Sequence, residues 1–366
     1  MCAAQIMASQ WMTPRYPSGS LKKILADADA GACISTECEK EFSREMYAKL
    51  RSEFGLPDVV RDIPLALSVA GDAIRLANMP SGIEVAIFLA MQESSLASRV
   101  ICGDIEGEER AWLEPACWFA QIRSTLGLRP SEDIWVNAAC ASGNYGLAAA
   151  YDYVNESPGR HALVVASFST FPGASSAFVN VGIAASRACK PFHAERDGTL
   201  VSEGAAALLL ASSVGASYRE PECALLGYGL TCDAYNQVAP DPSGDSALNC
   251  VLGALDSARI TAEDIGYINA HGTGTWANDE IEADVIKKAG LNGARRSSTK
   301  AYTGHCMLAS ALIEACICSQ IMTTGLIPDD TYLGPARPLE DERPFNLIMS
   351  NSFGFGGANS SIVLGR

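Results

Sequence analysis

Residues 134–154 read "IWVNAACASGNYGLAAAYDYV", an apolar stretch that breaks at Cys-Ala-Ser-Gly and resumes as an alanine-rich pattern. The stretch before the break predicts a buried strand, and the stretch after it predicts a helix. A cysteine at this junction lies at the positive end of the helix dipole, beside free backbone N–H groups, and both lower the pKa of a thiol. Cys140 is therefore either a nucleophile or an inert buried thiol, and this stretch alone leaves both open.

A second stretch repeats this layout. Residues 297–322 read "SSTKAYTGHCMLASALIEACICSQIM", with His305 at the break before another apolar, alanine-containing helix. Each break is followed further on by an apolar strand that runs into small residues, "ALVVASFSTFPG" and "NLIMSNSFGFGG". We interpret this as an internal duplication with a period of about 150 to 170 residues, longer than a solenoid repeat. Two similar halves packed together would bring both breaks to one seam.

The chain from residue 63 onward alternates short apolar runs with alanine-rich segments, which indicates an α/β protein with mainly buried strands. Before it, residues 1–62 are polar and irregular, with one clear helical segment at 43–55. We predict a divergent N-terminal segment over 1–62, a first half over 63–212 and a second half over 213–366. The clearest elements are a helix over 65–79 and strands over 84–91, 161–169 and 204–212.

Composition excludes several classes of protein. The 366 residues are 48% hydrophobic and 19% charged, which indicates a globular fold with a large core. A net charge of −15 argues against binding nucleic acid or anionic membranes. Neither a charged leader nor an uninterrupted apolar run of about 18 residues is present, so no signal peptide or membrane span is expected.

Cysteine usage points to a reducing compartment. The 13 cysteines are odd in number and scattered without a repeating spacing, which predicts a cytoplasmic protein. Cys33 and Cys38 could be half of a metal site, but no second pair or paired histidines stand near them. We therefore expect no metal.

Two of the four histidines stand where a ligand could reach them. His271 lies in "INAHGTGTWANDEIEADVIKK" (268–288), where flanking glycines would leave it exposed at the end of a strand. His305 precedes a helix, whose dipole disfavours the imidazolium and keeps the ring neutral. Neutral imidazoles can donate hydrogen bonds to a developing oxyanion. By contrast, His161 precedes a strand and His193 lies in a charged loop, so we assign both to structure or surface.

The chain from about residue 63 resembles the elongating β-ketoacyl-[acyl carrier protein] synthases of the thiolase-like superfamily. Five signatures occur in the order of that family: "NAACASG", "PFHAERDGTLVSEGAAALLL", "AHGTGTWANDEIE", "SSTKAYTGH" and "SNSFGFGGANSS". The resemblance implies an α/β fold of two duplicated halves packed as a five-layer α-β-α-β-α core. The N-terminal "MCAAQIMASQWMTPRYP" departs from the valine-rich strand with which the family usually opens.

Carried over residue by residue, the resemblance implies a Cys-His-His triad. Cys140 would be the nucleophile that accepts the acyl group, and His271 and His305 would complete the triad. Two further pairs of residues would belong to the site. Lys300 would pair with Glu314 beside the triad, and Thr273 and Thr275 would contact the phosphopantetheine arm of the substrate.

The aromatic gate would be Phe355, whose backbone N–H would form the oxyanion hole with that of Cys140. The implied reaction is a decarboxylative Claisen condensation between malonyl-ACP (acyl carrier protein) and an acyl group on Cys140, in fatty-acid, polyketide or polyene-type biosynthesis. It needs no cofactor. From these roles we expect His305→Ala to spare acylation of Cys140 and to block decarboxylation.

The resemblance also implies partners and leaves two alternatives open. The partners would be ACP and a second chain, as a homodimer or as a heterodimer with a related ketosynthase-like chain. The basic stretch "KKAGLNGARR" (287–296) is a candidate docking surface for ACP. The alternatives are an acyltransferase that passes the acyl group to an alcohol or amine, and a subunit of a ketosynthase/chain-length-factor pair.

Overall fold

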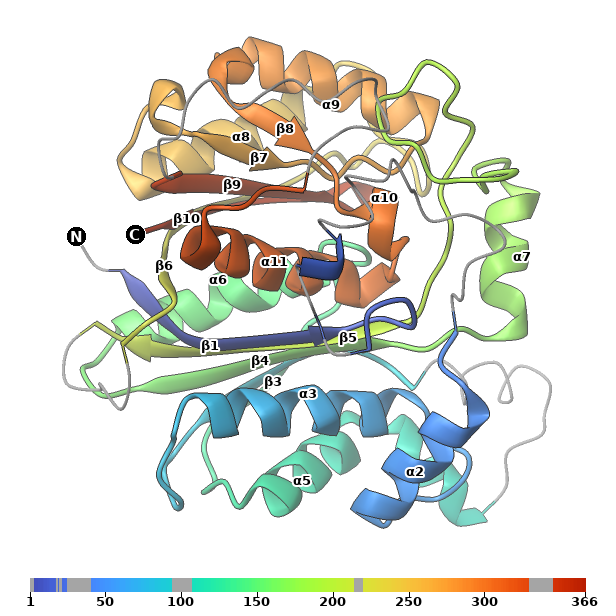
Figure 1. The fold of residues 1–366 in the computed structure, drawn as a ribbon, viewed down its shortest axis with the longest axis vertical. Helices are drawn as coiled ribbons and strands as arrows, with labels where there is room; N and C mark the ends of the chain where they lie inside the picture. Colours follow the sequence, from blue (N-terminus) through green and yellow to red (C-terminus); the bar gives the residue numbers. More distant parts are fainter. Residues whose placement is uncertain are drawn as a thin grey trace.

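Two similar halves, each built around five strands, make up the protein (Figure 1). The computed structural model describes residues 3–17, 19, 22–24, 41–93, 107–213, 220–328 and 345–366. The elements of the first half are β1 (Ala4–Met12), α2 (Arg44–Phe54), α3 (Asp62–Leu76), β2 (Ala86–Ala90), α5 (Pro115–Leu126), β3 (Asp133–Trp135), α6 (Ser142–Asn155), β4 (His161–Phe168), α7 (Pro172–Asn180) and β5 (Gly204–Ser212). The elements of the second half are β6 (Cys223–Cys232), α8 (Asp245–Ala258), β7 (Tyr267–Asn269), α9 (Trp276–Lys288), β8 (Arg295–Ser297), α10 (Lys300–Thr303), α11 (Ser310–Thr324), β9 (Leu347–Phe353) and β10 (Ala358–Gly365).

The order of the strands shows the duplication. The strands run β3-β2-β4-β5-β1 in the first half and β8-β7-β9-β10-β6 in the second. In each half the first three strands of that order are parallel, and the last two pair in antiparallel fashion. The halves are joined edge to edge where β1 pairs with β6 over Ala4–Ile6. The predicted internal duplication is confirmed by this shared topology.

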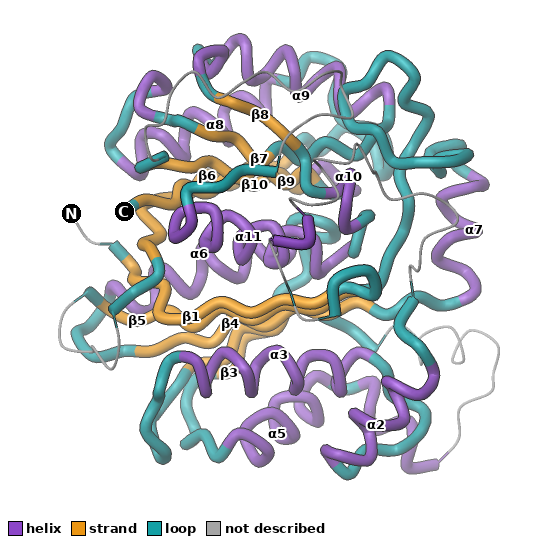
Figure 2. Tube along the Cα trace, in the orientation of Figure 1, coloured by secondary structure: helices purple, strands orange, loops and turns teal. Residues whose placement is uncertain are grey.

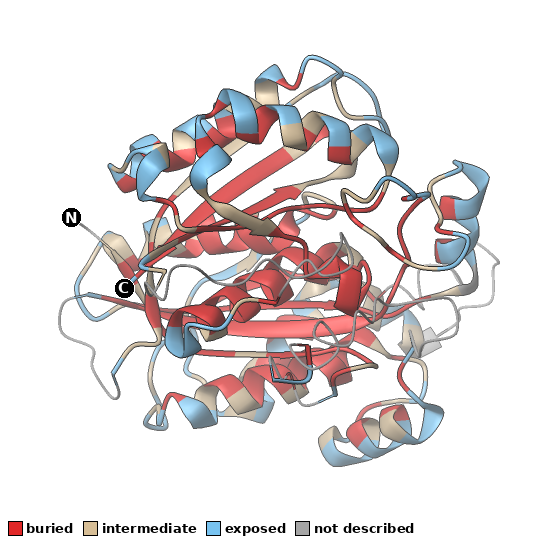
Figure 3. Cartoon of the chain, turned by 45° about the horizontal axis from the view of Figure 1, so that its top comes forward, coloured by how far each residue is buried: buried red, intermediate tan, exposed pale blue. Residues whose placement is uncertain are grey.

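The two groups of strands form separate layers with helices between and outside them (Figures 1 and 2). Helices α6 and α11 fill the space between the layers, while α3 and α5 cover one outer face and α8 and α9 cover the other (Figure 1). The predicted five-layer α-β-α-β-α arrangement is confirmed. Its central elements are the most buried part of the molecule (Figure 3).

Helix α11 is the clearest example of that burial. With the turn before it, Met307–Thr324 is apolar and long enough to cross a membrane, but 78% of it is buried inside the fold. Its hydrophobic character therefore reflects its place between two sheet layers, where every face of a helix must be apolar. Gly143 near the start of α6 allows the two central helices to touch, because a Cβ there would lie 2.4 Å from the backbone nitrogen of Leu312.

The predicted separate segment over residues 1–62 needs a correction. Strand β1 lies within it and pairs with β5 along its whole length, so the first half begins near residue 4 rather than at 63. Sequence reasoning missed this strand because seven of its nine residues are buried, so it lacks the alternation of a half-exposed strand. The predicted helices over 43–55 and 65–79 and the strands over 84–91, 161–169 and 204–212 are all present within a few residues.

Candidate active site

Cys140 lies on a tight turn between β3 and α6. Ala139 adopts a left-handed conformation with φ of 49°, which is uncommon for a residue with a side chain. The Ser142 hydroxyl stabilises this turn, since it accepts from the Ala138 N–H at 2.8 Å and donates to the Ala139 carbonyl at 2.6 Å. The turn thus fixes the cysteine two residues before Ser142, the first residue of α6.

A glycine-rich turn after β9 packs against this elbow. A Cβ on Gly354 would lie 2.8 Å from the carbonyl oxygen of Ala138, so a larger residue would push the two turns apart. The backbone N–H groups of Phe355 and of Cys140 both act to lower the pKa of the Cys140 thiol. The ring of Phe355 stacks on Phe178 of α7, with centroids 5.7 Å apart. The two N–H groups are placed where an oxygen bound to the thioester carbon of an acyl-cysteine could be held.

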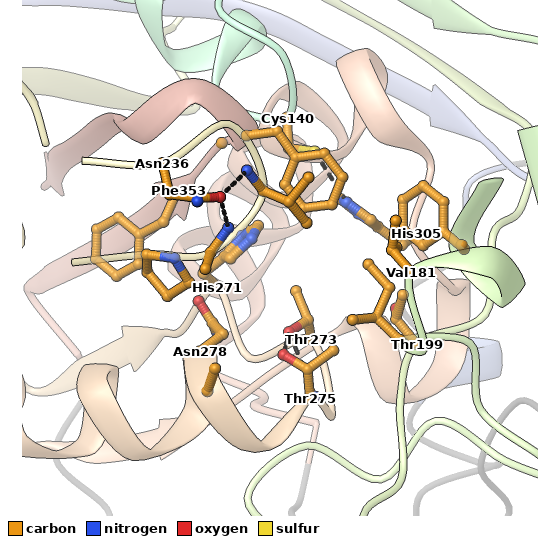
Figure 4. A pocket seen from close by; sticks show the side chains of 18 of the residues that line it. Cys140, Val181, Thr199, Asn236, His271, Thr273, Thr275, Asn278, His305 and Phe353 are labelled. Carbon is orange, nitrogen blue, oxygen red and sulfur yellow. Dashed lines mark hydrogen bonds between the residues drawn. The ribbon is translucent and has the colours of Figure 1, made fainter. Parts of the chain in front are cut away.

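His305 faces the cysteine from the second half. It lies between α10 and α11, and its Nε2 is 3.0 Å from Cys140 Sγ (Figure 4). On the other side of the ring, Nδ1 is 3.0 Å from the hydroxyl of Ser310, the first residue of α11. Burial, and next the positive charge of Lys300, hold the pKa of His305 well below its usual range. The ring is therefore neutral near pH 7.

His271 lies beside His305 on the loop between β7 and α9. The two rings are nearly perpendicular, with centroids 5.8 Å apart. Glu282 fixes the loop because its carboxylate accepts from the backbone N–H groups of His271 and Gly272, each at 2.8 Å. Burial, followed by the charges of Lys300 and His305, lowers the pKa of His271 well below its usual range.

Lys300 connects His271 to the central helix α11. Its Nζ is 2.5 Å from Glu314 Oε1, 2.7 Å from the His271 carbonyl oxygen and 3.3 Å from His271 Nδ1. Lys300 and Glu314 are both buried. The predicted pairing of these two residues is therefore present, and the ammonium group also orients the His271 ring.

A cavity of about 520 Å³ brings the candidate residues together. Cys140, His271 and His305 line it, and so do Thr273 and Thr275, whose hydroxyl oxygens lie 2.9 Å apart (Figure 4). Partly exposed apolar side chains also line the cavity: Val181 (49% exposed), Val238 (37%) and Trp276 (55%). A long substrate with apolar and amide groups could enter along this wall.

The acidity of Cys140 differs from the sequence-based expectation. We expected the helix start to lower the thiol pKa, but burial raises it to about 11, although Lys300 and the two backbone N–H groups act in the opposite direction. Desolvation outweighs these favourable contacts because the side chain is almost completely enclosed. Cys140 is therefore a neutral thiol at pH 7, and it needs a base to become a nucleophile.

Three residues of the site had no signal in the sequence. Phe178 and Asn236 line the cavity, and Ser310 contacts His305 from behind it, yet none of them belongs to a motif that marks chemistry. His161 and His193 do not line the cavity, in agreement with their assignment to structure or surface. Among the described residues no group of three or more His, Cys, Asp or Glu is arranged to hold a metal, and Cys33 and Cys38 lie outside those residues.

Comparison with protein-family models identifies the fold and the family. Residues 119–215 match the β-ketoacyl synthase N-terminal domain, and residues 222–333 match the β-ketoacyl synthase C-terminal domain. The chain belongs to the β-ketoacyl synthase family. The boundary between the two matched regions falls between β5 and β6, where the duplication places it.

Individual relatives agree with this family. The chain is 32% identical over 266 residues to Nodulation protein E of Rhizobium sp. (strain N33), covering 68% of this chain and 65% of that protein. It is 36% identical over 194 residues to 3-oxoacyl-[acyl-carrier-protein] synthase 2 of Rhizobium meliloti (strain 1021), covering 49% and 46%. The matched region thus spans about half to two thirds of the length of these relatives.

A solved structure of the ishigamide ketosynthase/chain length factor shares the fold. It superposes with a TM-score of 0.82 at 24% identity, covering 100% of this chain and 99% of that chain. This likeness confirms the thiolase-like ketosynthase architecture predicted from the sequence.

Proposed function

We propose that this chain is a condensing enzyme that joins an acyl group on Cys140 to the two-carbon unit of malonyl-ACP by decarboxylative Claisen condensation. The observation that carries this proposal is the contact of 3.0 Å between Cys140 Sγ and His305 Nε2 in a cavity that His271 also lines. This geometry supports a site in which a nucleophile, a base and a second hydrogen-bond donor act on one substrate.

In the first half-reaction the Cys140 thiol takes an acyl group from ACP. Because its pKa is raised to about 11, the thiol must lose its proton as it attacks, and His305 Nε2 is the base within reach. The thiolate bonds to the thioester carbon, the donor thiolate leaves, and that leaving group takes up the proton. The N–H groups of Cys140 and Phe355 would hold the oxyanion.

In the second half-reaction the malonyl thioester enters the same cavity. Its carbonyl oxygen would accept hydrogen bonds from the imidazoles of His271 and His305, whose lowered pKa values keep them neutral donors. When CO₂ leaves, the electrons of the broken C–C bond form an enolate that these donors stabilise. The enolate carbon then attacks the acyl-Cys140 carbonyl, and the Cys140 thiolate leaves. The product is a 3-oxoacyl thioester.

ACP would present its substrates on a phosphopantetheine arm. Thr273 and Thr275 line the cavity and offer hydroxyl groups to the amides of such an arm. The basic stretch over residues 287–296 begins at the far end of α9, roughly 16 Å along the helix from Trp276 at the cavity, at the rise of an α-helix. It remains the proposed docking surface for ACP.

The remaining proposals concern assembly and setting. Strand β3 ends the sheet of the first half, and Trp135 on it is 47% exposed, so this edge is the proposed contact with a second chain, either a copy or a chain-length-factor-like partner. All nine cysteines within the described part of the chain are free thiols, which supports a cytoplasmic location. The proposed chemistry uses no cofactor.

Steady-state turnover tests the proposed function. The protein, with acyl-ACP of graded chain length and malonyl-ACP, should release CO₂ and form 3-oxoacyl-ACP in equal amounts. Acylation of Cys140 without release of CO₂ would instead favour the acyltransferase that passes the acyl group to an alcohol or amine. No product with any acyl chain, from a protein that is correctly folded, would overturn the proposal.

A further inference from the structure

The two imidazoles of the cavity are held by partners of different chemistry. His271 Nδ1 faces the ammonium of Lys300 at 3.3 Å, and His305 Nδ1 faces the hydroxyl of Ser310 at 3.0 Å. An ammonium group can only donate a hydrogen bond, whereas a hydroxyl group can donate or accept. The first partner therefore fixes the position of the ring proton, and the second does not.

For His271 the consequence is a single tautomer. Since Lys300 donates to Nδ1, the proton of the neutral ring must reside on Nε2. The ring then presents Nε2 as a permanent donor. A permanent donor suits a group that has one task in the proposed reaction, which is to stabilise the enolate.

For His305 the proposed reaction requires both tautomers. While the Cys140 thiol is protonated, Nε2 must accept its proton, so the ring proton resides on Nδ1. Once Cys140 carries an acyl group, Nε2 must donate to the malonyl carbonyl oxygen, so the ring proton resides on Nε2. Ser310 can accept from Nδ1–H in the first state and donate to Nδ1 in the second by rotation of its hydroxyl.

We propose that Ser310 is a positioning residue that allows His305 to change tautomer between the two half-reactions. This inference rests on the proposed function. The ring carries one proton in both resting states, on Nδ1 before acylation and on Nε2 after it, so the exchange changes neither its charge nor its number of protons. Ser310 touches neither substrate nor the sulfur, and it acts only through the imidazole.

Because the site is buried, the Ser310 hydroxyl is the partner on which the tautomer of His305 depends. Ser310 is 3% exposed and His305 is 2% exposed, so water does not replace the serine at Nδ1 without rearrangement. In a Ser310→Ala variant, a proton on Nδ1 would be an unpaired buried N–H, which is costlier than an unpaired lone pair. The ring would then keep its proton on Nε2 and lose its ability to accept from the thiol.

Nitrogen NMR of histidine-labelled protein reads the tautomers directly, without any ACP. The chain has four histidines, so single-residue variants assign every ring signal. In the wild type we expect the His305 proton on Nδ1 before carboxamidomethylation of Cys140 and on Nε2 afterwards, while His271 keeps Nε2–H throughout. In Ser310→Ala, His305 should show Nε2–H in both states. The same His305 tautomer before and after modification of the wild type would overturn the inference.

Rates complete the test. Ser310→Ala should slow alkylation of Cys140 by about tenfold, the effect of one lost hydrogen bond of roughly 1.4 kcal/mol. Ser310→Thr, which keeps the hydroxyl, should restore most of the rate. Ser319→Ala is the matched control, because Ser319 is buried in the same helix but bonds to Glu222 at 2.7 Å. Equal slowing in the control would mean that the effect is structural. Because neither readout uses ACP, failure of the inference and failure of the proposed function are separable.

Discussion

Removal of the buried charge on Lys300 should affect stability and catalysis in separable ways. In Lys300→Met the Glu314 carboxylate loses its partner at 2.5 Å, although both side chains are buried. Breaking such a pair costs about 3 to 5 kcal/mol, because Glu314, whose pKa burial already raises to about 7, must then stay charged without a partner or take up a proton. For a chain of 366 residues that is a drop in melting temperature of about 4 to 7 °C.

A second substitution separates the two effects. Lys300→Met/Glu314→Leu removes both charges, so most of the lost stability should return, as is common when a buried pair is replaced by apolar groups. Condensation should stay low in both variants, because His271 Nδ1 has lost the ammonium that orients its ring. As a surface control for melting alone, since Lys288 lies in the proposed docking stretch, Lys288→Met breaks an ion pair of 2.8 Å that is half exposed, and it should cost less than about 1 kcal/mol.

Thermal melting by near-UV circular dichroism and steady-state formation of 3-oxoacyl-ACP measure these two outcomes. The reasoning fails if Lys300→Met has the same melting temperature as the wild type. It also fails if the double variant is less stable than the single variant, or if it recovers wild-type turnover along with its stability.

Three further predictions follow from the geometry of the site. His271→Ala should spare acylation of Cys140 and abolish decarboxylation, whereas His305→Ala should slow both steps, which single-turnover mass spectrometry separates. The expectation for His305→Ala differs from the one based on sequence, because His305 contacts the Cys140 sulfur. The rate of alkylation of Cys140, measured by peptide mass spectrometry, should keep rising with pH beyond pH 9, since only the thiolate reacts and its pKa is raised to about 11. A rate that reaches a plateau below pH 8 would refute this. Gly143→Ala should destabilise the fold by about 1 to 3 kcal/mol in a urea titration and reduce turnover, because its Cβ would lie 2.4 Å from the backbone of α11; Gly146→Ala, whose nearest neighbour is a side-chain methyl at 3.1 Å, should do much less.

The sequence could predict the fold and the candidate site because their signals are local. The cysteine elbow, the strand that ends in His271 and the glycine-rich turn each combine residues with a defined backbone requirement. Their order along the chain carries the resemblance to the family. The duplication was readable because Cys140 and His305 stand 165 residues apart in similar settings, and both lie at the cavity.

What the sequence could not predict depends on contacts between distant residues. The helix start at Cys140 implies an acidic thiol, but burial by the second half raises the pKa instead. Strand β1 is covered on both faces, so its pattern has no alternation to reveal it. The stacking of Phe178 on Phe355 and the bond from Ser310 to His305 join side chains for which no spacing rule exists.

A single-turnover chase tests the central claim most directly. The protein is first acylated with acyl-ACP, the mass of the adduct on Cys140 is recorded, and malonyl-ACP is then added in the absence of free acyl donor. We expect the adduct to disappear as one equivalent of CO₂ is released and one equivalent of 3-oxoacyl-ACP appears, and Cys140→Ser should show neither adduct nor product. An adduct that survives the chase, or that is lost to water or an alcohol without release of CO₂, would contradict the assignment of this site to condensation.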